Sequence, residues 1–274
     1  MGVTKAENGF YLFLSVDLIN STLYKTKDPD WSELFINIYN HTIKIITTVW
    51  SRAKVWKILG DELLFYAKIT NEQQLVDALE STTTITKELS DYLNKNSPKD
   101  IPIKLAFKTT LWSGLVASSL GKDSSKWKYL NLVVGDFVPT NRSLDFIGPD
   151  IDTGFRIAKS AFRNVILIDA KLALIFHIVI PQFNLNAKIV YFDQFKGVWD
   201  NQHYPIVWYT KDWTRLIEGF DYEDKFKNKV IMWIEDDNNT KLRNVAELLK
   251  IFNQLHKTDE INDIFKILKI KSRI

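Results

Sequence analysis

Two aspartates near the start of the chain have the chemistry to share a metal ion. Asp17 ends the apolar run FYLFLSVDL, and Asp61 follows a glycine in the turn of KILGDELLFY. Carboxylates held close together repel each other unless a cation lies between them, and Mg²⁺ or Mn²⁺ is commonly held by carboxylates plus substrate phosphates. Asp61 could equally cap an ordinary turn, so spacing alone leaves both interpretations open.

The elements that must position these aspartates follow from the periodicity of the sequence. Runs rich in branched and aromatic residues predict strands, and apolar residues at helical spacing predict helices. The predicted order is strand 10–18, helix 30–50, strands 53–59 and 62–69 joined as a hairpin, helix 71–95 and strand 103–112. This βαββαβ order is the ferredoxin-like α+β arrangement, in which the end of the first strand adjoins the hairpin.

The rest of the chain divides into a continuation of this domain and a helical extension. A short strand in LVVGDFV, a helix after GPDID, a helix near 170–180 and strands in NVILID, KIVYFDQF and YPIVWYT continue the first domain, residues 1–211. From residue 212 the composition turns to charged helix, in EDKFKNKVIMWIEDDNN and TKLRNVAELLKIFNQLHK. We therefore expect residues 212–274 to form a helical C-terminal extension.

Composition excludes several classes of function. The chain has 274 residues, 46% of them hydrophobic, which is enough for a substantial core. Its 36 basic and 33 acidic residues leave a net charge of only +3, so no strong field attracts nucleic acid. There is no cysteine, and the four histidines lack metal-ligand spacing. The longest apolar run, LALIFHIVI, is far shorter than the roughly 20 residues that span a membrane, and no export signal is visible. We expect a cytoplasmic protein without nucleic-acid or membrane partners.

Three segments in order resemble the class III nucleotidyl cyclases. FLSVDLINST followed by KILGDELLF is similar to the two metal-binding segments of that family, in which Asp, an apolar residue and then Ser or Thr are paired with Lys-x-x-Gly-Asp. DFIGPDIDTGFRIAKSA is similar to the helix that reads the base and stabilises the transition state. The resemblance covers residues from about 10 to 210 and implies the class III cyclase catalytic fold.

The resemblance also implies roles for individual residues. Asp17 and Asp61, with the carbonyl of Leu18, would bind two divalent ions, Mn²⁺ or Mg²⁺. Arg156 would contact the triphosphate and stabilise developing charge, and Lys196, in a segment like the family's closing hairpin, would bind phosphate. From the residues alone, Arg156 could belong to a solvated basic helix face, and Lys196 could be an ordinary turn lysine.

Three further residues fall where the family binds its substrate. Lys57 and Asp145 stand at the positions of the base-reading pair of adenylate cyclases, although Lys57 could simply extend from an apolar strand to the sheet edge. Asp152 stands where the family has an asparagine that orients ribose or phosphate. An acid there repels a triphosphate unless it faces a hydroxyl or a cation, which leaves its role open.

The same resemblance indicates partners and a substrate. Family members build each site from two subunits, so a single chain holding every motif implies a homodimer with two shared sites. The pattern DIDTGFR is most similar to the stand-alone uridylate and cytidylate cyclases of the bacterial Pycsar anti-phage defence system. These convert UTP or CTP to cyclic UMP or cyclic CMP, which activates a separate effector. An adenylate cyclase making cyclic AMP, and an inactive module that only binds nucleotide, are the alternatives.

Overall fold

A four-stranded antiparallel unit forms the centre of the protein. The computed structural model describes residues 8–97, 102–117, 131–134, 145–213 and 243–271. Strands β1 (Gly9–Ile19), β2 (Lys54–Leu59), β3 (Glu62–Ile69) and β4 (Ala106–Ala117) alternate with helices α1 (Ser21–Lys27), α2 (Trp31–Val49) and α3 (Glu72–Asn96). The strands pair in the order β4-β1-β3-β2. The predicted ferredoxin-like arrangement is therefore confirmed.

The sheet continues beyond β4. Its further strands are β5 (Asn131–Val134), β6 (Asp145–Ile147), β7 (Ile166–Ile168), β8 (Ala187–Gln194) and β9 (His203–Tyr209). Helices α4 (Pro149–Ile157), α5 (Ala170–Val179) and α6 (Phe183–Asn186) and the short 3-10 turns Ala158–Ser160 and Trp199–Asn201 connect them. Strand β7 runs parallel to β4, and β9 and β8 follow outward. The strands expected in NVILID, KIVYFDQF and YPIVWYT are all present.

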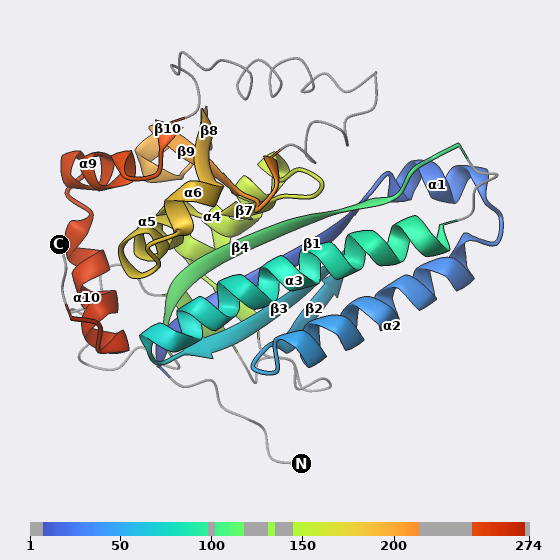
Figure 1. Ribbon diagram of the computed structural model, residues 1–274, viewed down its shortest axis with the longest axis horizontal. Helices are drawn as coiled ribbons and strands as arrows, with labels where there is room; N and C mark the ends of the chain where they lie inside the picture. Colours follow the sequence, from blue (N-terminus) through green and yellow to red (C-terminus); the bar gives the residue numbers. More distant parts are fainter. Residues whose placement is uncertain (1–7, 98–101, 118–130, 135–144, 214–242, 272–274) are drawn as a thin grey trace.

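The C-terminal extension contributes a strand as well as helices. Residues Arg243–Asn244 form β10, which pairs with Ile189 and Lys188 at the outer edge of β8. Helices α9 (Glu247–Gln254) and α10 (Thr258–Leu268) follow and lie beside α5 and the neighbouring end of β1 (Figure 1). The helix expected in EDKFKNKVIMWIEDDNN and the end of LVVGDFV lie outside the described residues. The extension is thus joined to the main sheet by main-chain hydrogen bonds.

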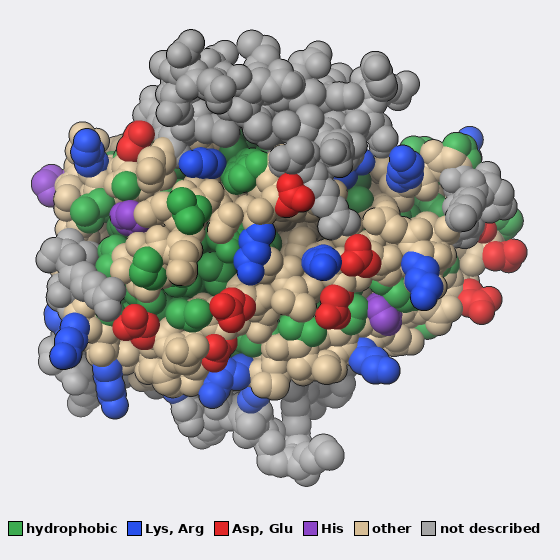
Figure 2. Space-filling view, in the orientation of Figure 1, with side chains coloured by type: hydrophobic (Ala, Val, Ile, Leu, Met, Phe, Trp, Pro, Cys, Tyr) green, Lys and Arg blue, Asp and Glu red, His purple; other side chains and the backbone are tan. Residues whose placement is uncertain are grey.

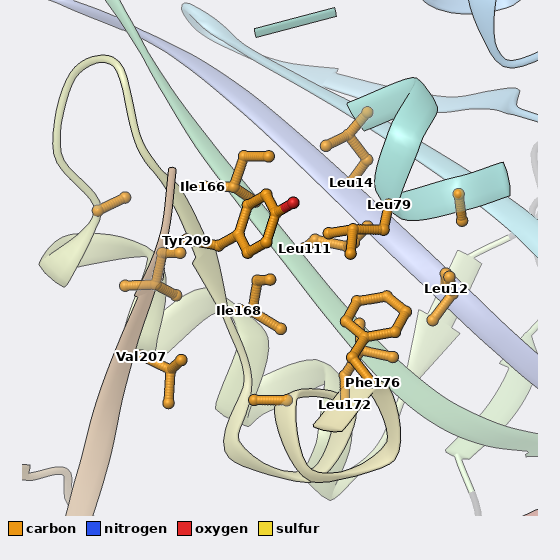
Figure 3. Close-up of a cluster of buried hydrophobic side chains, with 14 of the residues drawn as sticks. Leu12, Leu14, Leu79, Leu111, Ile166, Ile168, Leu172, Phe176, Val207 and Tyr209 are labelled. Atoms are coloured by element: carbon orange, nitrogen blue, oxygen red, sulfur yellow. The ribbon is translucent and has the colours of Figure 1, made fainter. Parts of the chain in front are cut away.

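The larger hydrophobic core lies between the sheet and helices α2 and α3, which run side by side across one face (Figure 1). The even-numbered residues of β1 point into this core because side chains alternate along a strand. Figure 3 shows Leu12 and Leu14 from β1 meeting Leu79 of α3 and Phe176 of α5. A core that reaches both the first strand and α5 fixes the relative positions of elements far apart in sequence.

The opposite face of the sheet carries a smaller, aromatic cluster. Tyr11 and Phe13 of β1 contact side chains that belong to β2, β3, β4, β6 and α4, which are Trp56, Leu64, Tyr66, Trp112, Val116, Phe146 and Ile151. Phe13 stacks on Trp112 with ring centroids 5.6 Å apart and meets Phe146 edge-on at 5.0 Å. Asp17 follows in the same odd-numbered alternation, so its side chain belongs to this face.

The visible surface over α2 and α3 mixes acidic and basic side chains without a large patch of one sign (Figure 2). In the part of the chain that the structure describes, no helix is long and apolar enough to cross a membrane.

Candidate active site

Asp17 and Asp61 come together because the sheet register brings their strands side by side. Asp17 is paired with Glu62 across β1 and β3, and Asp61 precedes Glu62 in the turn between β2 and β3. Gly60 adopts a left-handed conformation with φ 63°, which glycine adopts without strain. The Ser21 hydroxyl donates a hydrogen bond to Asp61, and the Tyr39 hydroxyl donates to the carbonyl of Gly60 at 3.2 Å. These contacts fix the turn beside the end of β1.

The electrostatics around the two aspartates are those of a negatively charged site. Burial raises the pKa of Tyr39, and the charges of Asp61 and Asp17 raise it further. The pKa of Glu62 is also raised, mainly by burial, although the hydrogen bond from Ser15 opposes the shift and the charges of Asp17 and Asp61 add to it. The negative charges of both carboxylates therefore raise the pKa values of neighbouring acidic groups, as expected at a place where a cation would be stabilised.

The donor set fits a hard divalent ion. Asp17 and Asp61 offer carboxylate oxygens, and Leu18, whose side chain is buried, follows Asp17 in the strand. Within the described ranges no three acidic or histidine side chains are placed to hold a metal together. A site with two protein carboxylates leaves positions for a backbone oxygen, water and substrate phosphates, which is the usual pattern for Mg²⁺.

A lysine that sequence reasoning missed belongs to this site. Lys108 of β4 approaches Asp17 with its Nζ 2.7 Å from Oδ2, and the two side chains are about equally exposed. Strand β4 pairs with β1 so that Asp17 and Lys108 lie opposite each other. Only this register reveals the pair, because the sequence around Lys108 is that of an ordinary amphipathic strand. Lys108 offsets part of the local negative charge.

Lys57 and Asp145 form a second polar pair. Lys57 Nζ lies 2.8 Å from Asp145 Oδ1, and Trp56 Nε1 donates to the same oxygen at 3.0 Å. Asp145 begins β6, and its backbone neighbour Phe146 also donates to Oδ1 at 2.9 Å. Lys57 lies over the Trp56 ring, 4.6 Å from the centroid. Three donors on one oxygen hold the Asp145 carboxylate in a defined orientation, and its other oxygen has none of these contacts.

Helix α4 carries Asp152 and Arg156 away from the aromatic cluster. Asp152 is exposed and Arg156 is half-buried, and neither side chain forms an ion pair or hydrogen bond with another of the described residues. Gly154 lies against the indole of Trp112, where an added Cβ would come within 2.3 Å of the ring. This contact explains the glycine in DIDTGFR, since only glycine lets the helix approach the indole so closely.

Lys196 lies in the connection between β8 and β9. It is exposed, and Gly197 beside it has φ 76° and donates its N–H to Asn201 Oδ1 at 2.8 Å. The structure places no other predicted site residue next to it. Asp17, Leu18 and Asp61 are thus brought together, and Lys57 and Asp145 form a separate pair. Among the described residues, no side-chain hydrogen bond or ion pair joins Arg156, Asp152 or Lys196 to either group.

The comparison with known proteins concerns the fold that carries these residues. No protein-family model matches the chain, and no curated protein matches its sequence. Among solved structures, the adenylyl cyclase CyaB from P. aeruginosa superposes with a TM-score of 0.56 at 13% identity, over 75% of this chain and 95% of that chain.

Two other solved structures superpose comparably. The catalytic core of a rhodopsin-guanylyl cyclase with converted specificity, in complex with ATPαS, gives a TM-score of 0.54 at 15% identity, over 75% of this chain and 97% of that chain. The guanylate cyclase domain of RhGC from Catenaria anguillulae, in complex with GTP, gives 0.52 at 14% identity, over 75% and 98%. The chain therefore has the catalytic fold of the class III nucleotidyl cyclases.

Proposed function

We propose that this protein is a nucleotidyl cyclase that converts UTP, or CTP, to 3′,5′-cyclic UMP, or cyclic CMP, and pyrophosphate. The observation that carries the proposal is the juxtaposition of Asp17 and Asp61 at adjoining strand ends of a class III cyclase fold. Both aspartates belong to segments that match the family's metal-binding motifs. A negatively charged pair at this place in this fold supports nucleotide chemistry over a structural turn.

The reaction forms a bond from the ribose O3′ to the α-phosphorus and breaks the bond from that phosphorus to the bridging oxygen of pyrophosphate. Two divalent ions held by Asp17, Asp61 and the Leu18 carbonyl would supply an ionised 3′-hydroxyl near neutral pH and neutralise the leaving group. Arg156 binds the triphosphate oxygens, because a planar guanidinium can donate to two of them at once. Lys196 binds the departing pyrophosphate.

The base is held by Lys57 and Asp145. The Asp145 oxygen that accepts from Trp56 and Lys57 is fully engaged, which leaves its other oxygen to accept from an amino or imino group of the base. Trp56 lies directly beside this pair and reduces the room for a base, which favours a pyrimidine. Trp112 and Phe146 are fully buried in the aromatic cluster, so they affect the room for a base only indirectly, through their packing.

An adenylate cyclase is the second candidate, and the Lys57–Asp145 pair favours it on chemical grounds. Lys57 could donate to N1 of adenine while Asp145 accepts from the 6-amino group. The matched CyaB is an adenylyl cyclase by name. Both candidates share the same metal and phosphate chemistry and differ only in the base.

A homodimer completes each site in this proposal. Within one chain, Arg156 and Lys196 make no contact with the aspartate pair, so these groups would meet the metals of a second copy. The cyclic product would act on a separate effector as a messenger in anti-phage defence. The signal that starts synthesis would then have to act on this dimer.

The proposal is tested by incubating the purified protein with Mn²⁺ and each of the four nucleoside triphosphates. We expect pyrophosphate and one 3′,5′-cyclic product, with UTP or CTP preferred over ATP. Asp61→Ala should abolish the product, and Glu33→Gln, which changes an exposed carboxylate on α2, should not. No product with any nucleotide, or an active Asp61→Ala, would overturn the proposal.

An inactive nucleotide-binding module is the competing class of function. The Lys108–Asp17 ion pair and the exposed carboxylate of Asp152 favour it, because the first offers a cation in place of a metal and the second repels phosphate. Calorimetric titration of a nucleoside triphosphate separates the two. Saturable binding without any pyrophosphate release would support the module.

A further inference from the structure

A buried lysine joins three elements that are distant in sequence. Lys171, in the first turn of α5, lies with its Nζ 2.6 Å from Asp150 Oδ1 and 2.6 Å from Glu260 Oε1. Its side chain is 8% exposed, and that of Glu260 is 9% exposed. Asp150 belongs to α4 and Glu260 to α10. The C-terminal extension thereby places a charged side chain inside the first domain.

The charge of the buried Lys171 is stabilised by the two carboxylates that contact it, and theirs by the lysine. Burial opposes the charged form of Lys171, but the carboxylates of Asp150 and Glu260 outweigh it and hold the lysine pKa above its ordinary range. Asp169, which caps α5, adds a third acidic group nearby. Removing one partner of a buried ion pair leaves an uncompensated charge, which is strongly destabilising locally. The three elements are therefore held in one relative position.

Further hydrogen bonds connect the Lys171 ion pair to the backbone of α4. Asp150 uses its other oxygen to accept from Asn131 Nδ2 at 2.7 Å. Asn131 Oδ1 in turn accepts from the backbone N–H of Asp150 at 3.0 Å. Since Asp150 is in the first turn of a nine-residue helix, any shift in its position is transmitted to Arg156 at the other end. Such a shift of about 1 Å can cost a hundredfold in rate.

We propose that Lys171 and Glu260 are positioning residues that lock α10 to α4 and so set the orientation of Arg156. The inference rests on the proposed function, because Arg156 acts on the triphosphate only if the protein is a cyclase. It assigns the C-terminal extension an indirect part in catalysis, through the position of Arg156. Docking of α10 then determines whether the helix that bears Arg156 is in place.

Glu260→Gln provides the test, with Asp263→Asn as its matched control. Gln keeps the size of the side chain and an acceptor for Lys171 but removes the charge, whereas Asp263 pairs with Lys266 at the surface of the same helix. We expect Glu260→Gln to lower kcat/KM by about tenfold or more, with Asp263→Asn within twofold of the parent. Equal kinetics for both variants would overturn the inference.

A double-mutant cycle with Arg156→Ala distinguishes positioning from a general loss of structure. If Glu260 acts through Arg156, the double variant should be no slower than Arg156→Ala alone, because the affected group is already absent. If the losses of kcat/KM in the two single variants multiply in the double variant, the two residues act independently and the inference is contradicted. A wild-type protein that makes no cyclic product would instead refute the proposed function.

Amide hydrogen exchange tests the coupling without reference to activity. We expect the α4 amides of Glu260→Gln to exchange at least tenfold faster than those of Asp263→Asn, while the amides of α3 exchange at the same rate in both. Unchanged exchange at α4 would show that α10 does not hold this helix. This outcome would overturn the inference even in a protein with no measurable cyclase activity.

Discussion

At the scale of single residues, the Lys57–Asp145 pair should matter more for binding of the proposed substrate than for stability of the fold. The two side chains are 30% and 47% exposed, so their ion pair contributes at most about 1 kcal/mol to folding. Its geometry nevertheless presents one cationic donor and one free carboxylate oxygen together. A change here should alter substrate binding far more than it alters the folded state.

We predict that Lys57→Ala lowers kcat/KM for the preferred nucleotide by about ten- to a hundredfold, since a charged hydrogen bond to the base is lost. Lys54→Ala, which removes an exposed lysine from the same strand, should leave it within twofold. Thermal unfolding should be nearly the same for both. Steady-state kinetics and melting curves check this, and equal kinetics for the two variants would remove Lys57 from the site.

The buried carboxyl of Asp169 makes stability depend on pH. Its oxygens accept from the backbone N–H groups of Ser113 and Leu172, and burial raises its pKa from 3.8 to about 6. In this window the folded protein retains a proton that the unfolded chain has released. The free energy of unfolding therefore falls as pH rises from about 4 to 6.

Asp169→Asn should abolish that dependence, because an amide does not titrate there. We predict that the stability of the parent relative to Asp169→Asn declines by up to about 3 kcal/mol across the window. Urea unfolding at several pH values measures the difference. Stability curves that stay parallel from pH 4 to 7 would show that the carboxyl titrates normally.

At the scale of elements, much of the site was predictable because it depends on neighbouring strands. The strand before Asp17 and the hairpin around Asp61 were both evident from pattern, and a ferredoxin-like order places them together. The Asp17–Lys108 pair was not predictable, because it depends on the register between β1 and β4. Strand β10 was missed for a different reason, since a strand of two residues carries no periodic signal.

Gly154 shows how helix α4 is fitted to the sheet. Alanine usually stabilises a helix over glycine by about 1 kcal/mol. Here its Cβ would lie 2.3 Å from Trp112 Cε2 and 2.4 Å from Nε1, so the helix or the indole must move. Overpacking of this kind typically costs about 1–3 kcal/mol.

We predict that Gly154→Ala is destabilised by about 1–3 kcal/mol and lowers the melting temperature by several degrees. Thr153→Ala, on the exposed side of the same helix, should stay within about 0.5 kcal/mol of the parent. Urea unfolding compares the two. A Gly154→Ala variant more stable than the parent would mean that α4 is free to move off the indole.

At the scale of the whole molecule, the two groups of residues that the proposed site needs belong to different parts of one chain. Asp17 and Asp61 lie beside the β2–β3 turn, whereas Arg156 is on α4. If each site combines the aspartates of one subunit with the arginine of another, a defect on one side can be complemented by a subunit that is defective on the other.

We predict that Asp61→Ala is inactive alone, that Arg156→Ala keeps only a small residual rate, and that far more activity returns when their subunits are mixed. Random pairing of equal amounts gives half heterodimers with one intact site each, so about a quarter of the parent activity should return. Mixing Asp17→Ala with Asp61→Ala should restore nothing. Activity is measured as pyrophosphate release after subunit exchange, and absence of recovery in the first mixture would exclude shared sites.

The contact between Lys171 and Glu260 also has a consequence for synthesis of the chain. The two residues are 89 positions apart. At typical translation rates of about 5–20 residues per second, Glu260 is made roughly 4–18 seconds after Lys171. During that interval the lysine has Asp150 and the nearby Asp169 as acidic neighbours but lacks Glu260. A nascent chain therefore contains the segments that carry Asp17, Asp61 and Arg156 before α10 can hold α4 in place, so under the proposed function Arg156 is fully positioned only after α10 has been synthesised.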